Sequence, residues 1–352
     1  MSRRAATVAL TAGLLVALIT AMAVFFPVPY SAMRPGPATN TLGNDSQGKP
    51  LITISGRQTY PTGSGQLDLT TVKISPKNYP MTLFEALQGW LDPDVAIVPR
   101  ELIYPNASET QEQIRQQNAE QMEMSQQHAT AAALKELGIE PTATYLLVSG
   151  VLPGAPADGK LQAGDVIVAV DGHRVATLED VTTRITAHDP GDQVSIEVKR
   201  GGANMTLDVP TVADANGKAR VGIEVEYGYE FPFDVSFQIE DIGGPSAGLM
   251  FALGIVDKLT PGEMTTGKSI AGTGTIDDAG AVGPIGGIQQ KIIGAKDAGA
   301  VMFLTPKDNC AEAMQSPPNG IHIVPVSTLH DALAAIDTLT TGDSAKLPSC
   351  PS

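Results

Sequence analysis

The stretch Asp241-Ile-Gly-Gly-Pro-Ser-Ala-Gly248 places a serine in a turn between an apolar strand and an apolar helix. We predict the strand over Val235–Ile239 and the helix from Ser246 to about Lys258. Because the helix is apolar on every side, we expect it to be buried. Ser246 then lies at a helix N-terminus, where backbone N–H groups lack intrahelical partners and the dipole favours negative charge. A tetrahedral oxyanion would be stabilised there, with the N–H groups of Ser246 and Ala247 as candidate donors.

A serine nucleophile needs a base, and Lys291 is the best candidate. It lies in a helix predicted over Gly286–Ala298, where helical spacing gives it a face of small and apolar residues: Gly287, Ile288, Gly294, Ala295 and Ala298. We expect Gln289, Gln290, Lys296 and Asp297 to point elsewhere. Burial lowers the pKa of a lysine, and a neutral lysine can take a proton from serine. The alternative is a lysine at the edge of a core helix, with its ammonium group in water.

Three motifs follow one another: Gly244-Pro-Ser-Ala-Gly248, Thr273-Gly-Thr-Ile276 and Gly283-Pro-Ile-Gly-Gly-Ile-Gln-Gln-Lys291. In this order they resemble the protease domain of the Lon family of serine peptidases, over roughly Val221–Ile336. The resemblance implies that Ser246 is the nucleophile and Lys291 the general base. It also implies that the hydroxyl of Thr273 helps to hold the lysine.

One position departs from the family's pattern. Many members carry an acidic residue directly before the Gly-Pro-Ser, where this chain has Gly243. Asp241 lies two positions earlier and is a further candidate contact of the active site.

Composition limits the other functions open to the chain. The 352 residues carry a net charge of −15, which argues against a nucleic-acid partner. The two cysteines show no zinc spacing, and the five histidines form no HExxH motif, so we expect neither a metal nor another cofactor.

The N-terminus predicts a membrane anchor. Ala5–Phe26 carries no charge and is long enough to span a bilayer, and Arg3 and Arg4 precede it. A cleaved signal peptide with the small-x-small pattern Ala21-Met-Ala23 is the alternative. Either interpretation places the rest outside the cytoplasm, and the first makes this a single-pass protein of the cell membrane. In such a location Cys310 and Cys350 could form a disulfide.

Residues 143–212 are rich in strands and turns. Pro153-Gly-Ala-Pro-Ala157, Gly164-Asp-Val-Ile167 and Val170-Asp-Gly172 resemble a PDZ domain of the bacterial protease type. PDZ domains add an extended peptide to a sheet edge. The nearest match to that edge and its loop is Tyr145, Leu146, Leu147 and Val148. Elsewhere, Thr82 and Ser108 are predicted to cap helices, and Ser327 to cap the last one.

Two further motifs are interpreted as coincidental. Gly262–Ser269 matches the P-loop pattern, but it follows a helix and leads into a strand, the reverse of what phosphate binding needs. We therefore expect no nucleotide and no ATPase domain. Gly244–Gly248 also matches the α/β-hydrolase elbow, but too little chain follows for the rest of that fold.

Together these features predict an α+β multidomain protein with an N-terminal transmembrane helix, a PDZ domain and a Lon-type α/β proteolytic domain. The segments are 1–30 (anchor), 31–142 (strands and helices), 143–212 (PDZ), 213–340 (protease) and 341–352 (tail). The layout resembles membrane-anchored PDZ–Lon-like serine proteases of the Gram-positive, actinobacterial type.

The resemblance implies an ATP-independent endopeptidase acting outside the cytoplasm on secreted or membrane-associated peptides and proteins, with the PDZ domain assisting substrate binding. It also predicts a homo-oligomer. The alternative is a catalytically silent, membrane-anchored PDZ scaffold.

Overall fold

The computed structural model describes residues 7, 10–18, 25–239 and 242–351, which form two compact units. Unit 1 comprises Met1–Ile54, Gln58–Leu137 and Val235–Ser352. Unit 2 comprises Ser55–Arg57 and Gly138–Asp234. Apart from the three residues at 55–57, unit 2 is therefore an insertion within the chain of unit 1.

Unit 1 is built on a six-stranded sheet in the order β18-β17-β14-β3-β1-β4. Its strands are β1 (Tyr30–Asn40), β3 (Gln66–Ile74), β4 (Ala96–Pro99), β14 (Ser269–Gly272), β17 (Met302–Pro306) and β18 (His322–Val326). Strands β3, β14, β17 and β18 are parallel, whereas β1 is antiparallel to both β3 and β4. The strands before residue 75 thus share one sheet with those after residue 268, and the region 31–142 is no separate module.

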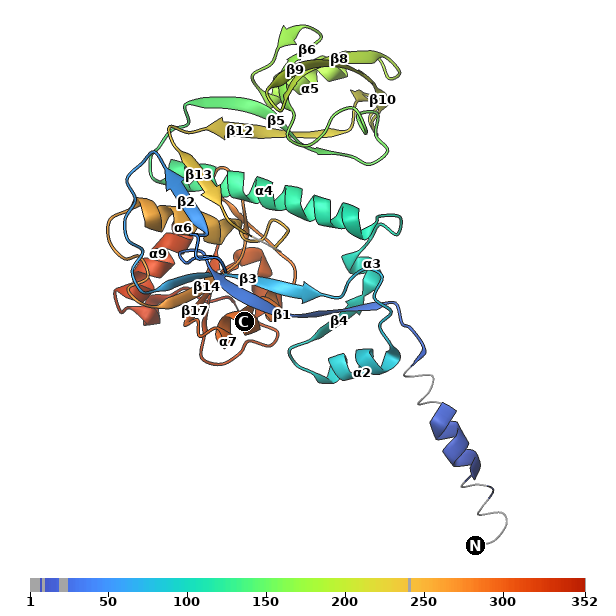
Figure 1. Ribbon diagram of the computed structural model, residues 1–352, viewed down its shortest axis with the longest axis vertical. Coiled ribbons are helices and arrows are strands. Elements are labelled where there is room, and N and C mark those ends of the chain that lie inside the picture. Colours follow the sequence, from blue (N-terminus) through green and yellow to red (C-terminus); the bar gives the residue numbers. More distant parts are fainter. Residues whose placement is uncertain (1–6, 8–9, 19–24, 240–241, 352) are drawn as a thin grey trace. The chain divides into compact units, whose positions relative to one another are not determined.

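Four long helices accompany this sheet (Figure 1). They are α4 (Gln111–Glu136), α6 (Gly248–Leu259), α7 (Ile288–Asp297) and α9 (Leu329–Thr340). Helix α6 is buried from Gly248 to Asp257, as its all-apolar sequence predicts. Helix α7 packs on β1 and β3, and α4 packs on α6. The two motif helices, α6 and α7, are therefore both held against the central layers of unit 1.

Helix starts follow the predicted caps in part. Thr82 caps α2 (Leu83–Leu91) through a capping box with Glu85, which confirms that prediction. The predictions at Ser108 and Ser327 are wrong, because Thr110 caps α4 with Gln113, and Thr328 caps α9 with Asp331. In each case a threonine one or two residues later has its own glutamine or aspartate three positions on, and that box decides the start of the helix.

The remaining elements of unit 1 are short. They are β2 (Ile52–Ser55), α3 (Arg100–Ile103), β13 (Asp234–Phe237), β15 (Thr275–Ile276), β16 (Val282–Gly283), η1 (Lys307–Asn309), α8 (Cys310–Ala313) and η2 (Ser344–Lys346). Strand β13 pairs with β2, and β15 pairs with β16.

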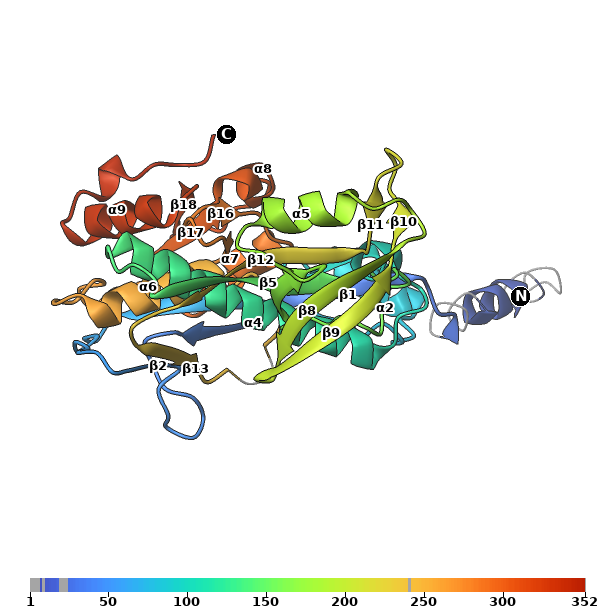
Figure 2. The same ribbon diagram turned by 90° about the horizontal axis from the view of Figure 1, so that it is seen from above.

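Unit 2 is a small sheet with one helix (Figure 2). The strand order is β12-β5-β6-β8-β9, and β7 pairs with β6. The elements are β5 (Ala143–Val151), β6 (Val166–Val170), β7 (His173–Arg174), α5 (Leu178–Thr186), β8 (Gln193–Arg200), β9 (Ala203–Pro210), β10 (Val212–Ala213), β11 (Ala219–Arg220) and β12 (Ile223–Glu230). Its core includes Leu146, Ile167, Val181, Ile185 and Ile196. The sheet therefore continues past residue 212, the predicted end of this module, because β12 supplies one of its strands.

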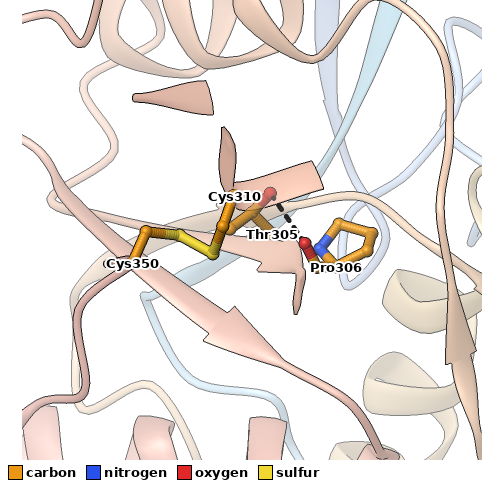
Figure 3. The surroundings of a disulfide bond; sticks show 4 residues. All are labelled: Thr305, Pro306, Cys310 and Cys350. Atoms are coloured by element: carbon orange, nitrogen blue, oxygen red, sulfur yellow. Dashed lines mark hydrogen bonds between the residues drawn. A yellow bond between two sulfur atoms is a disulfide. The ribbon is translucent and has the colours of Figure 1, made fainter. Parts of the chain in front are cut away.

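A disulfide joins Cys310 to Cys350, with the two Cα atoms 5.3 Å apart (Figure 3). This confirms the predicted pairing. Cys310 begins α8, so the bond fastens the C-terminal tail to a helix next to β17.

The N-terminal prediction needs correction. Among the described residues, no helix combines the length and the apolar character that crossing a bilayer demands. Within Ala5–Phe26 the helix is described at residue 7 and over 10–18, whereas 5–6, 8–9 and 19–24 lie outside the described residues. The prediction of a transmembrane helix is therefore wrong for the described residues, and the cell-membrane localisation inferred from it loses its support.

Candidate active site

Ser246 lies in the turn between β13 and α6. Helix α6 begins at Gly248 with Ala247 as its N-cap, two residues later than predicted. Gly244 adopts a φ of 88°, a left-handed conformation that favours glycine. The turn leaves Ser246 half-buried.

Lys291 projects from the first turn of α7 into the interior of unit 1. Its side chain is 2% exposed. The helix starts at Gly287, whose φ is 71° and where a Cβ atom would come within 2.8 Å of side-chain atoms of Met33 and Val72. Most of the predicted apolar face is buried, at Gly287, Ile288, Gly294 and Ala295; Ala298 is exposed, and Gln290 is buried as well. Burial lowers the pKa of Lys291 to about 7, so the amine is in large part neutral at physiological pH.

Three side chains converge at this point. The Nζ atom of Lys291 lies 2.7 Å from Ser246 Oγ and 2.8 Å from Thr273 Oγ1. Thr273 follows β14, is fully buried, and donates its hydroxyl proton to the carbonyl oxygen of Ser246 at 2.9 Å. The geometry thus brings together Ser246, Lys291 and Thr273, which lie on three separate elements.

The hydrogen bonds of Thr273 determine how Lys291 can act. A carbonyl oxygen carries no hydrogen, so the Thr273 hydroxyl must be the donor to Ser246 O and can only accept from Lys291. Neutral Lys291 therefore donates one N–H to Thr273 Oγ1. Its lone pair then remains available for the hydroxyl proton of Ser246. This is the arrangement that a general base requires.

The backbone around Ser246 supplies the candidate oxyanion donors. The carbonyl of Ser246 accepts from Thr273 Oγ1 and from the N–H of Gly274, both at 2.9 Å. These bonds fix the peptide group between Ser246 and Ala247. The N–H groups of Ser246 and Ala247 lie at the start of α6, where the helix leaves its first N–H groups without intrahelical partners.

The missing acidic residue before the Gly-Pro-Ser has a steric explanation. A Cβ atom on Gly243 would lie 2.7 Å from the Cβ atom of Asn118 on α4. A larger side chain at this position would have to displace α4. Asp241, the other acidic candidate, lies outside the described residues.

Two residues that the sequence analysis missed support the site. Ser125 on α4 donates its hydroxyl to Pro245 O at 3.0 Å. Asn309 bonds the backbone of Ile285, in the loop before α7. Both hydrogen bonds join residues that are not neighbours in the sequence, so no local sequence pattern predicts them.

A second candidate site is a groove in unit 2. Tyr145, Leu146, Leu147 and Val148 lie in β5, which pairs with β12 on one side and with β6 on the other, so these residues offer no free sheet edge. Within this unit the free edge next to β5 belongs to β12. A pocket of about 230 Å³ lies between β12 and α5, lined by Leu152, Val181, Ile185, Gly222, Ile223 and Val225 among others. Figure 2 shows α5 beside β12.

Two protein-family models match this chain. Residues 241–337 match the family model of the Lon protease (S16) C-terminal proteolytic domain, and residues 123–211 match that of the PDZ domain. The Lon protease of Azospirillum brasilense is 41% identical over 93 residues, which are 26% of this chain and 11% of that protein. Lon protease 2 of Herpetosiphon aurantiacus is 30% identical over 157 residues, 39% of this chain and 19% of that protein.

The PDZ domain of an SdrC-like protein from Listeria innocua is 30% identical, with a TM-score of 0.23, and covers 23% of this chain and 93% of that structure. The two family matches show that the chain contains a PDZ domain and a Lon-type proteolytic domain. It spans a small part of the length of its curated Lon relatives.

Proposed function

We propose that this chain is a serine endopeptidase that uses Ser246 and Lys291 as a catalytic dyad, without ATP, on unfolded or short peptide segments. The observation that carries the proposal is the buried Nζ atom of Lys291, 2.7 Å from Ser246 Oγ, with its pKa lowered to about 7. A serine in the turn before a buried helix, in contact with a buried lysine on a second helix, matches the requirements for an activated nucleophile. The match of this segment to Lon proteolytic domains supports the same activity.

Each step moves one proton through Lys291. Neutral Lys291 accepts the hydroxyl proton of Ser246 while Oγ bonds to the carbonyl carbon of the substrate. The carbonyl oxygen gains the electron pair, and the N–H groups of Ser246 and Ala247 stabilise this oxyanion. When the C–N bond breaks, the leaving amine takes the proton from Lys291. Water then attacks the ester, gives its proton to Lys291, and Ser246 regains that proton as the carboxylic acid leaves.

The loop that resembles a P-loop supports an activity without nucleotide. The carboxylate of Glu263 accepts hydrogen bonds from the N–H groups of Ser64, Gly65 and Gly267, at 3.0, 3.3 and 2.9 Å. Those are donors of the kind that a phosphate would need. One of the three donors, Gly267, belongs to Gly262–Ser269, and the carboxylate of Glu263 occupies the position that a phosphate would need beside it.

The groove between α5 and β12 is the proposed peptide-binding site of the PDZ domain. A peptide added to the free edge of β12 would place alternate side chains against Val181 and Ile185 of α5. Substrates with an apolar C-terminal residue fit this lining. The Lon resemblance also predicts self-assembly, which sedimentation velocity tests directly.

The test compares cleavage of casein without nucleotide by the full chain and by Ser246→Ala and Lys291→Ala variants. Lys296→Ala is the matched control, because Lys296 lies on the same helix but is exposed. The proposal requires cleavage by wild type and by the control, and none by the two site variants. Cleavage by all four would reject the dyad. The second candidate, a catalytically silent PDZ scaffold, predicts no Ser246-dependent labelling by a serine-reactive fluorophosphonate.

A further inference from the structure

Helix α4 holds the nucleophile turn at two points. The N–H of Gly244 donates to Asn118 O at 2.9 Å, and Ser125 Oγ donates to Pro245 O at 3.0 Å. Asn118 and Ser125 are two helical turns apart and so share one face of α4. Ser125 is 3% exposed, and a Cβ atom on Gly248 would lie 3.0 Å from its Oγ. The hydroxyl is therefore enclosed between α4 and the first residue of α6.

The bond to Pro245 O determines where the next N–H points. Among the described residues no peptide bond is cis, and in a trans peptide the C=O and N–H point in opposite directions. The C=O of Pro245 and the N–H of Ser246 belong to the same peptide group. Because Ser125 draws the oxygen toward α4, the N–H of Ser246 points away from α4.

This peptide group has a second accessible orientation. The proline ring fixes φ of Pro245, but its ψ can take either a helical or an extended value. The rotation between these two values turns the peptide group over and would aim the N–H of Ser246 at α4. The hydrogen bond from Ser125 favours the first orientation over the second.

We propose that Ser125 is a positioning residue that keeps the N–H of Ser246 directed into the oxyanion hole. The inference rests on the proposed peptidase function, because it concerns the transition state of that reaction. Ser125 contacts neither Lys291 nor Thr273 in the hydrogen-bond network, so its effect is on oxyanion stabilisation rather than on proton transfer.

Steady-state kinetics of the Ser125→Ala full chain on a fluorogenic peptide test this role. An oxyanion-hole donor contributes about 10²–10³-fold to kcat, and a residue that orients the donor contributes less, so we expect kcat to fall about 10–100-fold. KM stays within about twofold, because the lost interaction forms only in the transition state. The pH at half-maximal activity stays at the wild-type value, since the lysine is undisturbed.

Thr130→Val is the matched control. Thr130 lies on the same helix, and its hydroxyl donates to Gln126 O at 2.8 Å within α4. This variant should keep kcat within about twofold of wild type. If Ser125→Ala does not give the wild-type melting curve, Ser125→Cys replaces it, because a thiol of similar size is a weak donor and should also lower kcat.

The outcomes separate the inference from the proposed function. Wild-type kcat in a folded Ser125 variant overturns the inference and leaves the peptidase proposal intact. A loss of kcat with a shifted pH profile means that the dyad has moved, and this also overturns it. Absence of Ser246-dependent cleavage by wild type rejects the proposed function, and the inference with it.

Discussion

The side chain of Asn309 makes both backbone hydrogen bonds of Ile285. Its Nδ2 atom donates to the carbonyl oxygen at 2.8 Å, and its Oδ1 atom accepts from the N–H at 2.9 Å. Asn309 is 6% exposed, and Ile285 lies just before Gly287, the N-cap of α7. Since α7 carries Lys291, this contact sets the position at which the lysine helix begins.

Replacing Asn309 with alanine should lower both stability and activity. Two backbone groups of Ile285 would lose their partners, and an unsatisfied buried group costs about 1–3 kcal/mol. We expect a lower free energy of unfolding in urea and a lower kcat/KM. Asn319→Ala is the control, because Asn319 is exposed in the same unit. Equal losses in the two variants would contradict a specific role for Asn309.

The pH dependence of kcat/KM reports on Lys291. The protonated lysine cannot accept the proton of Ser246, so activity should fall as pH decreases below the pKa of about 7. Below that value we expect roughly a tenfold loss per pH unit, and above about pH 8 a plateau. Activity that keeps rising to pH 10 would mean that the lysine titrates as an ordinary exposed one. Lys291→Arg should be inactive at every pH, because arginine stays protonated.

The dyad could be predicted because it lies within short motifs. Ser246 and Lys291 follow the glycine pairs Gly243-Gly244 and Gly286-Gly287, whereas Thr273 follows β14, and the order of the three motifs along the chain is distinctive. The burial of α6 followed from a sequence that is apolar on every side, and that of most of α7 from the helical spacing of its small and apolar residues. Proton positions at Thr273 could not be predicted, because they depend on the distance between two hydrogen-bond partners in space.

Long-range contacts explain what the sequence did not reveal. Strand β3 pairs in parallel with β14, which lies about 200 residues later in the chain, and no local pattern encodes that neighbour. The sequence pattern predicts Tyr145–Val148 as the edge strand that binds a peptide. The free edge next to β5 belongs instead to β12, which lies about 80 residues later in the chain. Ser125 was missed for the same reason, since a lone serine in a polar helix is normally solvated.

Asp257→Asn should stabilise the protein above pH 6. Asp257 lies on α6, is 1% exposed, and its Oδ2 atom has no hydrogen-bond partner among the described residues. Burial raises its pKa to about 6, so its contribution to stability is complete below about pH 4 and is lost as pH rises through 6. We expect a higher melting temperature for the variant at pH 8 and no gain at pH 4. The exposed Asp308→Asn is the control, and a gain that is equal at both pH values would contradict this explanation.

The disulfide should stabilise unit 1 by shortening the unfolded chain. It closes a loop between Cys310 and Cys350, which are 40 residues apart. Loop entropy of this size corresponds to about 4 kcal/mol at most, so Cys350→Ala should lower the melting temperature by roughly 5–10 °C. Dithiothreitol should lower the melting temperature of wild type by a similar amount and leave that of the variant unchanged. A shift of the same size in both would point to an effect unrelated to this bond.

The two ends of unit 2 lie side by side. Thr142 donates its N–H to Glu230 O at 2.7 Å and its hydroxyl to the same oxygen at 3.1 Å, and Ala143 pairs with Glu230 across β5 and β12. Paired Cα atoms on antiparallel strands are about 5 Å apart, a gap that two residues can close. Unit 1 should therefore tolerate the removal of the insertion.

Replacement of residues 143–230 by Gly-Gly should leave a folded protein that still cleaves short peptides. The six-stranded sheet of unit 1 contains no residue of the deleted segment, and neither do the contacts of α4 with the nucleophile turn. The loss should appear in KM for longer substrates that end in an apolar residue, because the groove between α5 and β12 would be gone. KM for a tetrapeptide should stay within about twofold, because so short a substrate does not need a second binding site. If the variant folds and keeps the wild-type preference for apolar C-termini, the groove does not select substrates, and the selection must come from unit 1.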